Sequence, residues 1–127
     1  MILLDTSVLV DALTGPRRSA LALRGAFERG ERVLVPTLVL YEWLRGPRIA
    51  SELAAQEALF PSESALPFGA TEAARAATIY RAAQGARGRE IDIAIAACAL
   101  CRDATLWTLN VRDFQGIRDL AVRTPDG

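Results

Sequence analysis

The chain of 127 residues has the length of one domain, and its 51% hydrophobic content is enough to bury a core. Acidic and basic residues balance at 15 each, so any polyanion must be bound by a local basic patch rather than by net charge. Every basic residue is arginine. The absence of histidine and lysine excludes histidine-activated nucleophiles, histidine-ligated zinc, lysine-bearing phosphate loops and Schiff-base chemistry.

The first half of the chain alternates short apolar runs with helical periodicity. Residues 2–4 predict a fully buried strand, followed by a helix over 7–13 that stops at Thr14-Gly15-Pro16. Beyond this turn the pattern predicts a helix over 17–29 and a strand over 33–35. It then predicts a helix from an N-cap at Thr37 to Arg45, and a weaker helix over 48–60.

The second half continues the alternation. We predict a short edge strand over 65–68, a helix from Thr71 to a loop over 84–88, a helix over 89–102, a strand over 105–108, a turn or short helix over 110–114, and a strand over 120–122. The helix from Thr71 has a predicted apolar stripe of Ala73, Ala76, Ala77, Tyr80 and Ala83. This order predicts a single domain over 1–127, an α/β fold built as a three-layer α/β/α sandwich around a parallel sheet.

No apolar run is long enough to span a bilayer, and Asp5 interrupts the N-terminal run before a signal-peptide core forms. We therefore expect a soluble cytoplasmic protein. The C-x-x-C of Cys98 and Cys101 lies late in an apolar helix and has no second ligand pair, which favours packing over redox or zinc chemistry.

Four carboxylates stand in apolar surroundings far apart in the sequence. Asp5 ends the first strand, Glu42 lies on a helix that is apolar on nearly every side, Asp92 opens an apolar helix, and Asp113 follows the strand over 105–108. An ionised carboxylate drawn into low-dielectric surroundings needs compensation. We predict that the fold gathers all four around a divalent metal at the carboxyl edge of the sheet.

Each of these acids also has a structural interpretation. The alternatives are a helix cap for Asp5, an ion pair with Arg45 for Glu42, an ion pair with Arg89 for Asp92, and a turn for Asp113. Asp11 and Glu90 are ambiguous. The remaining glutamates, Glu72 among them, lie in polar neighbourhoods and are predicted to face solvent.

The motifs around the four acids resemble those of the PIN-domain ribonucleases, and in size and layout the VapC-type toxins of bacterial toxin-antitoxin pairs. The resemblance rests on Leu3-Leu4-Asp5-Thr6-Ser7, Tyr41-Glu42-Trp43-Leu44-Arg45-Gly46, Asp92 before Ile93-Ala94-Ile95-Ala96-Ala97, and Thr108-Leu109-Asn110-Val111-Arg112-Asp113-Phe114. No single motif is specific, but four in this order and spacing form a joint signal. Residues 48–87 contribute nothing to it.

The resemblance implies a metal-dependent endoribonuclease that acts as the toxin of a type II toxin-antitoxin system. Asp5 and Asp92 would contact Mg²⁺ or Mn²⁺ directly, while Glu42 and Asp113 would complete the shell through water or act as the base. A metal-activated water would cleave RNA, leaving a 5′-phosphate and a 3′-hydroxyl. Thr6, Ser7 and Asn110 are candidates to orient these acids or a phosphate.

Partners and competing functions follow from the same interpretation. The expected partners are RNA, a small antitoxin whose C-terminal segment occupies the active-site groove, and a second copy of the chain in a homodimer. Arginines over 81–89 and 112–118, with Arg45 and Arg48, are candidates to hold RNA. Two alternatives are a non-catalytic PIN-like binding module whose acidic pocket accepts an arginine, and a housekeeping RNA-processing nuclease.

Overall fold

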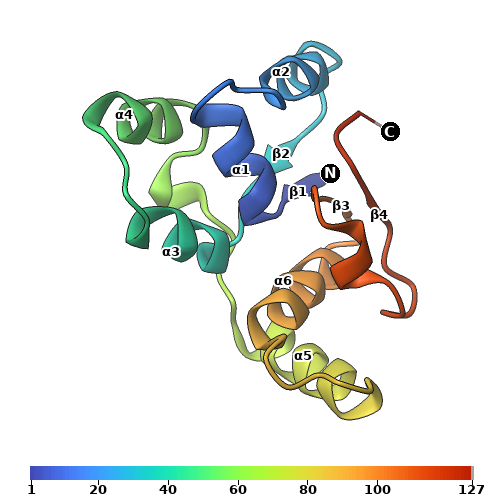
Figure 1. The fold of residues 1–127 in the computed structure, drawn as a ribbon. Helices are drawn as coiled ribbons and strands as arrows, with labels where there is room; N and C mark the ends of the chain where they lie inside the picture. The colour runs from blue at the N-terminus through green and yellow to red at the C-terminus, as the bar shows by residue number, and fades with distance from the viewer. Residues whose placement is uncertain (127) are drawn as a thin grey trace.

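Four short parallel strands form the centre of the computed structural model, which describes residues 1–126 (Figure 1). In spatial order they are β2 (Val33–Leu34), β1 (Ile2–Leu4), β3 (Thr105–Trp107) and β4 (Val122–Arg123). All three residues of β1 are buried, as expected for a parallel strand covered on both faces. Leu4 pairs with Trp107, so the residues that follow β1 and β3 meet at one edge of the sheet.

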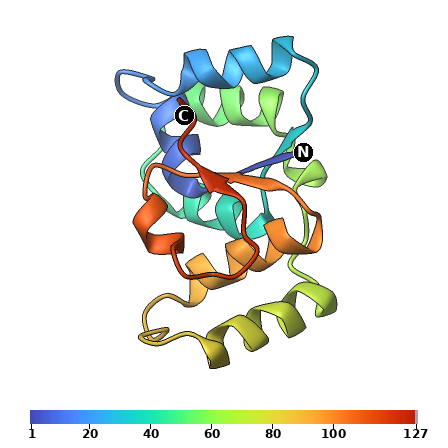
Figure 2. The same ribbon diagram turned by 90° about the vertical axis from the view of Figure 1, so that its right-hand side faces the viewer.

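Helices cover both faces of this sheet. They are α1 (Thr6–Leu13), α2 (Ala20–Glu28), α3 (Thr37–Arg45), α4 (Ala50–Leu59), α5 (Ala70–Ala82) and α6 (Glu90–Cys101), with short 3₁₀ segments η1 (Ser62–Ser64) and η2 (Val111–Phe114). In Figure 2, α2 and α4 lie above the strands, and α6 with α5 packed against it lies below them. The predicted α/β/α sandwich with a parallel sheet is confirmed.

The segment 65–68 is not the predicted edge strand. It forms one parallel bridge, between Pro36 and Leu66, flanked by hydrogen bonds from Leu66 N–H to the Val35 carbonyl (2.9 Å) and from Thr37 N–H to the Leu66 carbonyl (2.8 Å). The ladder ends because the other side turns into α3 at Thr37, and the N–H of Phe68 donates to the Thr37 hydroxyl (3.3 Å) instead of to a main-chain carbonyl. Residues 65–68 therefore lie beside the segment that follows β2 without becoming a strand.

The buried face of α5 also differs from the predicted stripe. Ala73, Ala77 and Tyr80 are exposed, whereas Glu72 and Ala76 are buried. Glu72 accepts a hydrogen bond from Arg102 (2.9 Å), and this ion pair lowers the pKa of Glu72, with Arg102 the principal cause. The prediction of a solvent-facing Glu72 was wrong because its partner lies just beyond α6, far away in the sequence.

The helix after the first turn is shorter than predicted. The helix predicted over 17–29 begins only at Ala20, because Arg17 adopts a positive φ of 54°.

Cys98 is buried, and burial raises the pKa of its thiol to about 11, which suits a packing role rather than a reactive one. Within residues 1–126, no helix is both long enough and apolar enough to cross a membrane.

Candidate active site

Asp5 lies where β1 gives way to α1, and only 6% of its surface is exposed. Its N–H donates to the carbonyl of Trp107 (2.9 Å), which holds the carboxyl ends of β1 and β3 together. Although Asp5 occupies the N-cap position of α1, the hydrogen bonds of its carboxylate go to side chains. Oδ2 accepts from the hydroxyls of Ser7 (2.9 Å) and Thr108 (2.7 Å).

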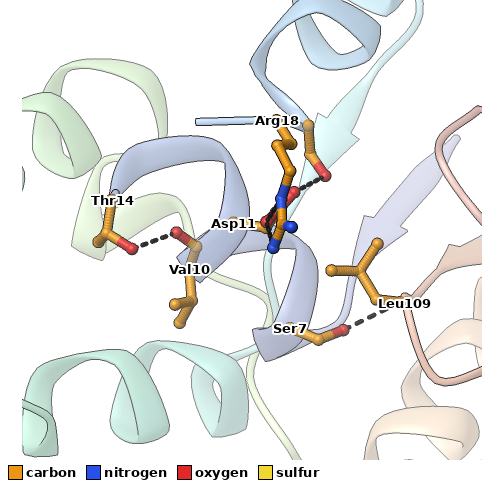
Figure 3. A network of polar contacts seen from close by, with 7 residues as sticks. Ser7, Val10, Asp11, Thr14, Arg18 and Leu109 are labelled. Atoms are coloured by element: carbon orange, nitrogen blue, oxygen red, sulfur yellow. Dashed lines mark hydrogen bonds and ion pairs between the residues drawn. The ribbon is translucent and has the colours of Figure 1, made fainter. Parts of the chain in front are cut away.

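The two hydroxyls are themselves fixed by the backbone. Ser7 Oγ accepts from the N–H of Leu109 (3.0 Å), as Figure 3 shows, and Thr108 Oγ1 accepts from the N–H of Asn110 (3.0 Å). Each hydroxyl has one hydrogen to give, and both hydrogens point to Asp5. Both donors are neutral, and none of the ion pairs of residues 1–126 includes Asp5.

Thr108 is a site residue that the sequence analysis did not select. It is completely buried directly after β3, and its partner Asp5 stands directly after β1. Its position in the sequence could have identified it. Thr108 directly follows β3 and Asp5 directly follows β1, so pairing of the two strands brings the hydroxyl to the carboxylate. Asn110, which was selected, is exposed and contributes its backbone N–H to this network.

Glu42 is brought to the same place by α3. Its Oε1 accepts a hydrogen bond from Thr6 Oγ1 (2.5 Å), and Thr6 follows Asp5 directly. Its Oε2 pairs with the guanidinium of Arg45 (3.3 Å), while the Glu42 side chain is 19% exposed. The structure thus contains both the predicted orienting contact from Thr6 and the structural ion pair that was its alternative.

Asp92 is half-buried in the first turn of α6, and its pKa is influenced by the other three acids. Burial is the largest cause that raises its pKa to about 6, and the charges of Asp5, Asp113 and Glu42 raise it further, in that order. Arg89 opposes the shift. All four predicted carboxylates therefore share one electrostatic neighbourhood, as like charges brought together by the fold.

Asp113 is the most accessible of the four, on the exposed side of η2. Arg89, the residue just before α6, donates a hydrogen bond to the main-chain carbonyl of Asp113 and so ties η2 to α6. Among the ion pairs of residues 1–126, none joins Arg89 to Asp92. The structural alternative proposed for Asp92 is therefore not realised.

The donor chemistry of this site suits a hard divalent cation, because the side chains offer carboxylate and hydroxyl oxygens. Within residues 1–126, however, no three acidic or other ligating side chains are gathered closely enough to form a complete metal cluster. Mg²⁺ commonly keeps several waters and takes one or two carboxylates directly. Two carboxylates would be enough for that smaller requirement.

Asp11, the ambiguous acid of α1, has a structural role. Its carboxylate accepts hydrogen bonds from Ser19 (2.6 Å) and Arg18 (3.1 Å), in the network drawn in Figure 3. The Ser19 hydroxyl is the main cause that lowers the pKa of Asp11, and Arg18 adds to it. This carboxylate is compensated inside α1 and the loop after it.

Comparison with known proteins identifies the family. Residues 2–120 match the PIN domain. Ribonuclease VapC19 of Mycobacterium tuberculosis is 36% identical, over 94% of this chain and 97% of its own. Among solved structures, DNA-bound VapBC from Salmonella typhimurium matches with a TM-score of 0.79 at 21% identity, covering 98% of this chain and 97% of that one. VapBC2 from Rickettsia felis, bound to a promoter DNA fragment, matches with a TM-score of 0.76 at 19% identity, covering 98% of both chains.

The structural matches agree with the observed order of strands and helices, and the sequence match extends over nearly the full length of its relative. The resemblance drawn from four short acidic motifs is confirmed, and the chain belongs to the PIN-domain family.

Proposed function

We propose that this protein is a metal-dependent endoribonuclease and the toxin of a type II toxin-antitoxin pair. The observation that carries the proposal is that hydrogen bonds link the elements that carry the four acids: Thr6, next to Asp5, donates to Glu42, and Arg89, next to α6, donates to the main-chain carbonyl of Asp113. The charges of Asp5, Asp113 and Glu42 accordingly raise the pKa of Asp92. The extended likeness to a protein named as a ribonuclease supports the choice of RNA as substrate. Cleavage of cellular RNA places the proposed activity in the cytoplasm.

In this proposal the four acids have two roles, metal binding and activation of water. Asp5, with Oδ2 held by Ser7 and Thr108, and Asp92 would hold Mg²⁺ or Mn²⁺. When bound, such an ion lowers the pKa of a bound water and offsets charge that builds on the phosphate. Glu42 and Asp113 would orient water for in-line attack or take its proton. The water oxygen bonds to phosphorus as the bond to the 3′-oxygen breaks, which leaves a 5′-phosphate and a 3′-hydroxyl.

An antitoxin partner is part of the proposal. The structural neighbours include VapBC complexes and a toxin-antitoxin complex from Klebsiella pneumoniae. The ion pair between Arg45 and Glu42 illustrates how a guanidinium neutralises an acid of this site. We propose that an arginine of a small antitoxin does the same when it blocks the groove, and that the toxin is a homodimer.

One observation favours the second candidate, a non-catalytic binding module with an acidic pocket. Residues 1–126 contain no complete three-ligand metal cluster, and a pocket that accepts an arginine needs none. The two candidates differ in their response to metal. A nuclease requires the ion for cleavage, whereas a binding module is indifferent to it.

The deciding experiment incubates the purified chain with single-stranded RNA in Mg²⁺, in Mn²⁺ and in chelator, and maps the ends of the products. We expect cleavage only with metal and 5′-phosphate ends. Metal should also raise the unfolding free energy, by about 2.7 kcal/mol at a hundred times its Kd. Intact RNA together with an unmoved melting temperature would remove the nuclease and leave the binding module.

A further inference from the structure

A cavity of about 470 Å³ lies beside the acidic site, between α5, the start of α6 and the loop after η2. Its walls include Arg75, Arg89 and Arg118, an apolar floor that includes Ile79 and Ile93, and the amide side chain of Gln115. We call it the arginine cavity. Its volume falls within the range of about 300–1,000 Å³ that is typical of small-molecule sites.

The arginine cavity is locally basic in a chain of zero net charge. Its three arginines outnumber its one lining acid, Asp119. The ion pairs within residues 1–126 are formed by other arginines (Arg18, Arg24, Arg29, Arg45 and Arg102), and the three cavity arginines take part in none. Arginines without a carboxylate partner are available to bind phosphate oxygens in bidentate geometry.

The cavity and the candidate active site are built from two shared elements. Arg89 and Ile93 line the cavity, and Asp92 stands next to Ile93 on α6. On the other side, Gln115 lines the cavity just beyond η2, which carries Asp113. Arg89 lines the cavity and also donates to the main-chain carbonyl of Asp113, so this one residue connects the cavity to the acidic site.

We propose that the arginine cavity binds one nucleotide of a single-stranded RNA next to the phosphodiester bond that is cut. This inference rests on the proposed nuclease function and adds the subsite that holds the substrate. The guanidinium groups take the flanking phosphates, and the aliphatic floor covers the face of the base. Gln84 and Gln115 offer amide donors and acceptors to the base edge, so this subsite sets the base preference of cleavage.

Single-stranded RNA suits this cavity better than its competitors. A base can enter a concave cavity of this size only when it is unpaired, so duplex RNA is excluded by shape. An acidic peptide would use the guanidinium groups, but it would leave the floor of Ile79 and Ile93 without a planar apolar partner. The nucleotide satisfies both features of the cavity at once.

The test measures binding of a labelled single-stranded RNA of random sequence to the full chain in chelator, where no cleavage occurs. Arg75→Glu and Arg118→Glu reverse charges that are exposed at the cavity, and Arg32→Glu is the matched control. Arg32 is also exposed, but it precedes β2 at the amino edge of the sheet, away from the acids. Circular dichroism and melting confirm that all three variants are folded.

We expect each cavity variant to weaken RNA binding by about tenfold, and Arg32→Glu to leave it unchanged. The slope of log K against log salt should become shallower by about 0.7 for each phosphate contact removed. Gln115→Ala should alter the order of affinity among four homopolymer RNAs. Equal binding by all variants would overturn the inference. So would normal RNA binding combined with loss of binding to a co-expressed antitoxin, which would make the cavity a protein interface.

Cleavage by the wild type separates this inference from the proposed function. If the wild type cuts RNA in Mg²⁺ while the cavity variants bind RNA as the control does, the subsite is wrong and the nuclease stands. If the cavity variants lose RNA binding while the wild type cuts nothing in Mg²⁺ or Mn²⁺, the subsite stands and the nuclease is wrong.

Discussion

Asp5 directly precedes α1 and Asp11 lies within it, yet the two carboxylates have different kinds of partner. Asp11, in the last turns of α1, accepts from Ser19 and pairs with the cationic Arg18 (Figure 3). Asp5, just before α1, accepts from the neutral hydroxyls of Ser7 and Thr108. The contrast teaches that two acids in apolar surroundings can differ in whether a cationic side chain of the same chain already pairs with them, and under the proposed function Asp5 is the one left for a metal ion.

The contrast has a measurable electrical consequence. Of the three acids whose charges raise the pKa of Asp92, Asp5 has the largest effect. Asp11 is not among those causes, and its own pKa is lowered by Ser19 and Arg18. Substitutions that remove one carboxylate or the other should therefore separate catalysis from stability.

The largest expected effect is on Asp5→Asn. The amide oxygen can still accept from Ser7 and Thr108, so the variant should fold, but it loses the charge that holds the cation. Since second-shell changes already cost 10–100-fold, we expect RNA cleavage to fall by at least about 100-fold. Asp11→Asn is the matched control and should keep its cleavage rate while losing about 1 kcal/mol of unfolding free energy.

Initial cleavage rates and urea melts of the two variants test this pair of expectations. If Asp11→Asn were folded and as inactive as Asp5→Asn, the distinction drawn between a neutralised acid and an oriented one would be wrong.

Thr108 offers the next largest effect. Thr108→Val keeps the volume of a completely buried side chain but removes the hydroxyl that orients Asp5 Oδ2. We expect cleavage to fall by about 10–100-fold, as for other residues that position a metal ligand, and Thr108→Ser to restore it. Thr14→Val is the control, because Thr14 donates to the Val10 carbonyl (2.7 Å) at the far end of α1 (Figure 3). Single-turnover cleavage rates of Thr108→Val and Thr14→Val measure the difference. Equal rates for these two variants would contradict a positioning role for Thr108.

The role of Thr108 also marks where sequence-based prediction ends. β1, α3, α6 and β3 were predictable because each is a local apolar run with a clear start and stop. The acids were predictable because each interrupts such a run. The hydrogen bond between Thr108 and Asp5 depends on the parallel register of β1 and β3, whose residues are 103 apart, and no local pattern encodes that pairing.

Two of the wrong predictions, one of secondary structure and one of burial, have a similar origin. An alanine-rich helix such as α5 has no strong apolar period, so the partner of Glu72 beyond α6 decides which face is buried. At 65–68, the apolar pattern predicted a strand, but the segment it pairs with enters α3 at Thr37 after a single bridge. In both cases the tertiary surroundings outweighed the local pattern.

Acid titration gives a smaller, diagnostic effect. The pKa of Asp92 rises from 3.8 in an unperturbed side chain to about 6 in the folded protein, so between these values the folded state holds a proton that the unfolded state has lost. Without metal, the unfolding free energy should therefore fall as pH rises toward 6. Glu72 does not obscure this between about pH 5 and pH 6. Its lowered pKa adds stability that is fully present above 4.5, its unperturbed value.

Urea melts in chelator between about pH 5 and pH 7 measure this slope, and Asp92→Asn should flatten it. Metal should act in the opposite sense, with a larger stabilisation above pH 6 than below it, because the cation and the proton compete for the same carboxylate. A wild-type slope that survives in Asp92→Asn would assign the titration to another group.

The smallest expected effect concerns Glu42, which lies between the two extremes of Asp5 and Asp11. One of its oxygens is oriented by the neutral Thr6, and the other is paired with Arg45, whose side chain is 55% exposed. Arg45→Gln should release that oxygen and tighten Mg²⁺ binding by at most about fivefold, the worth of an exposed ion pair. Arg24→Gln breaks a comparable pair with Glu28 on α2 and should leave metal affinity unchanged. Calorimetric titration of both variants measures the difference. Weaker Mg²⁺ binding by Arg45→Gln would mean that Arg45 holds Glu42 in place for the cation, and charge compensation would then not be the rule that separates Asp5 from Asp11.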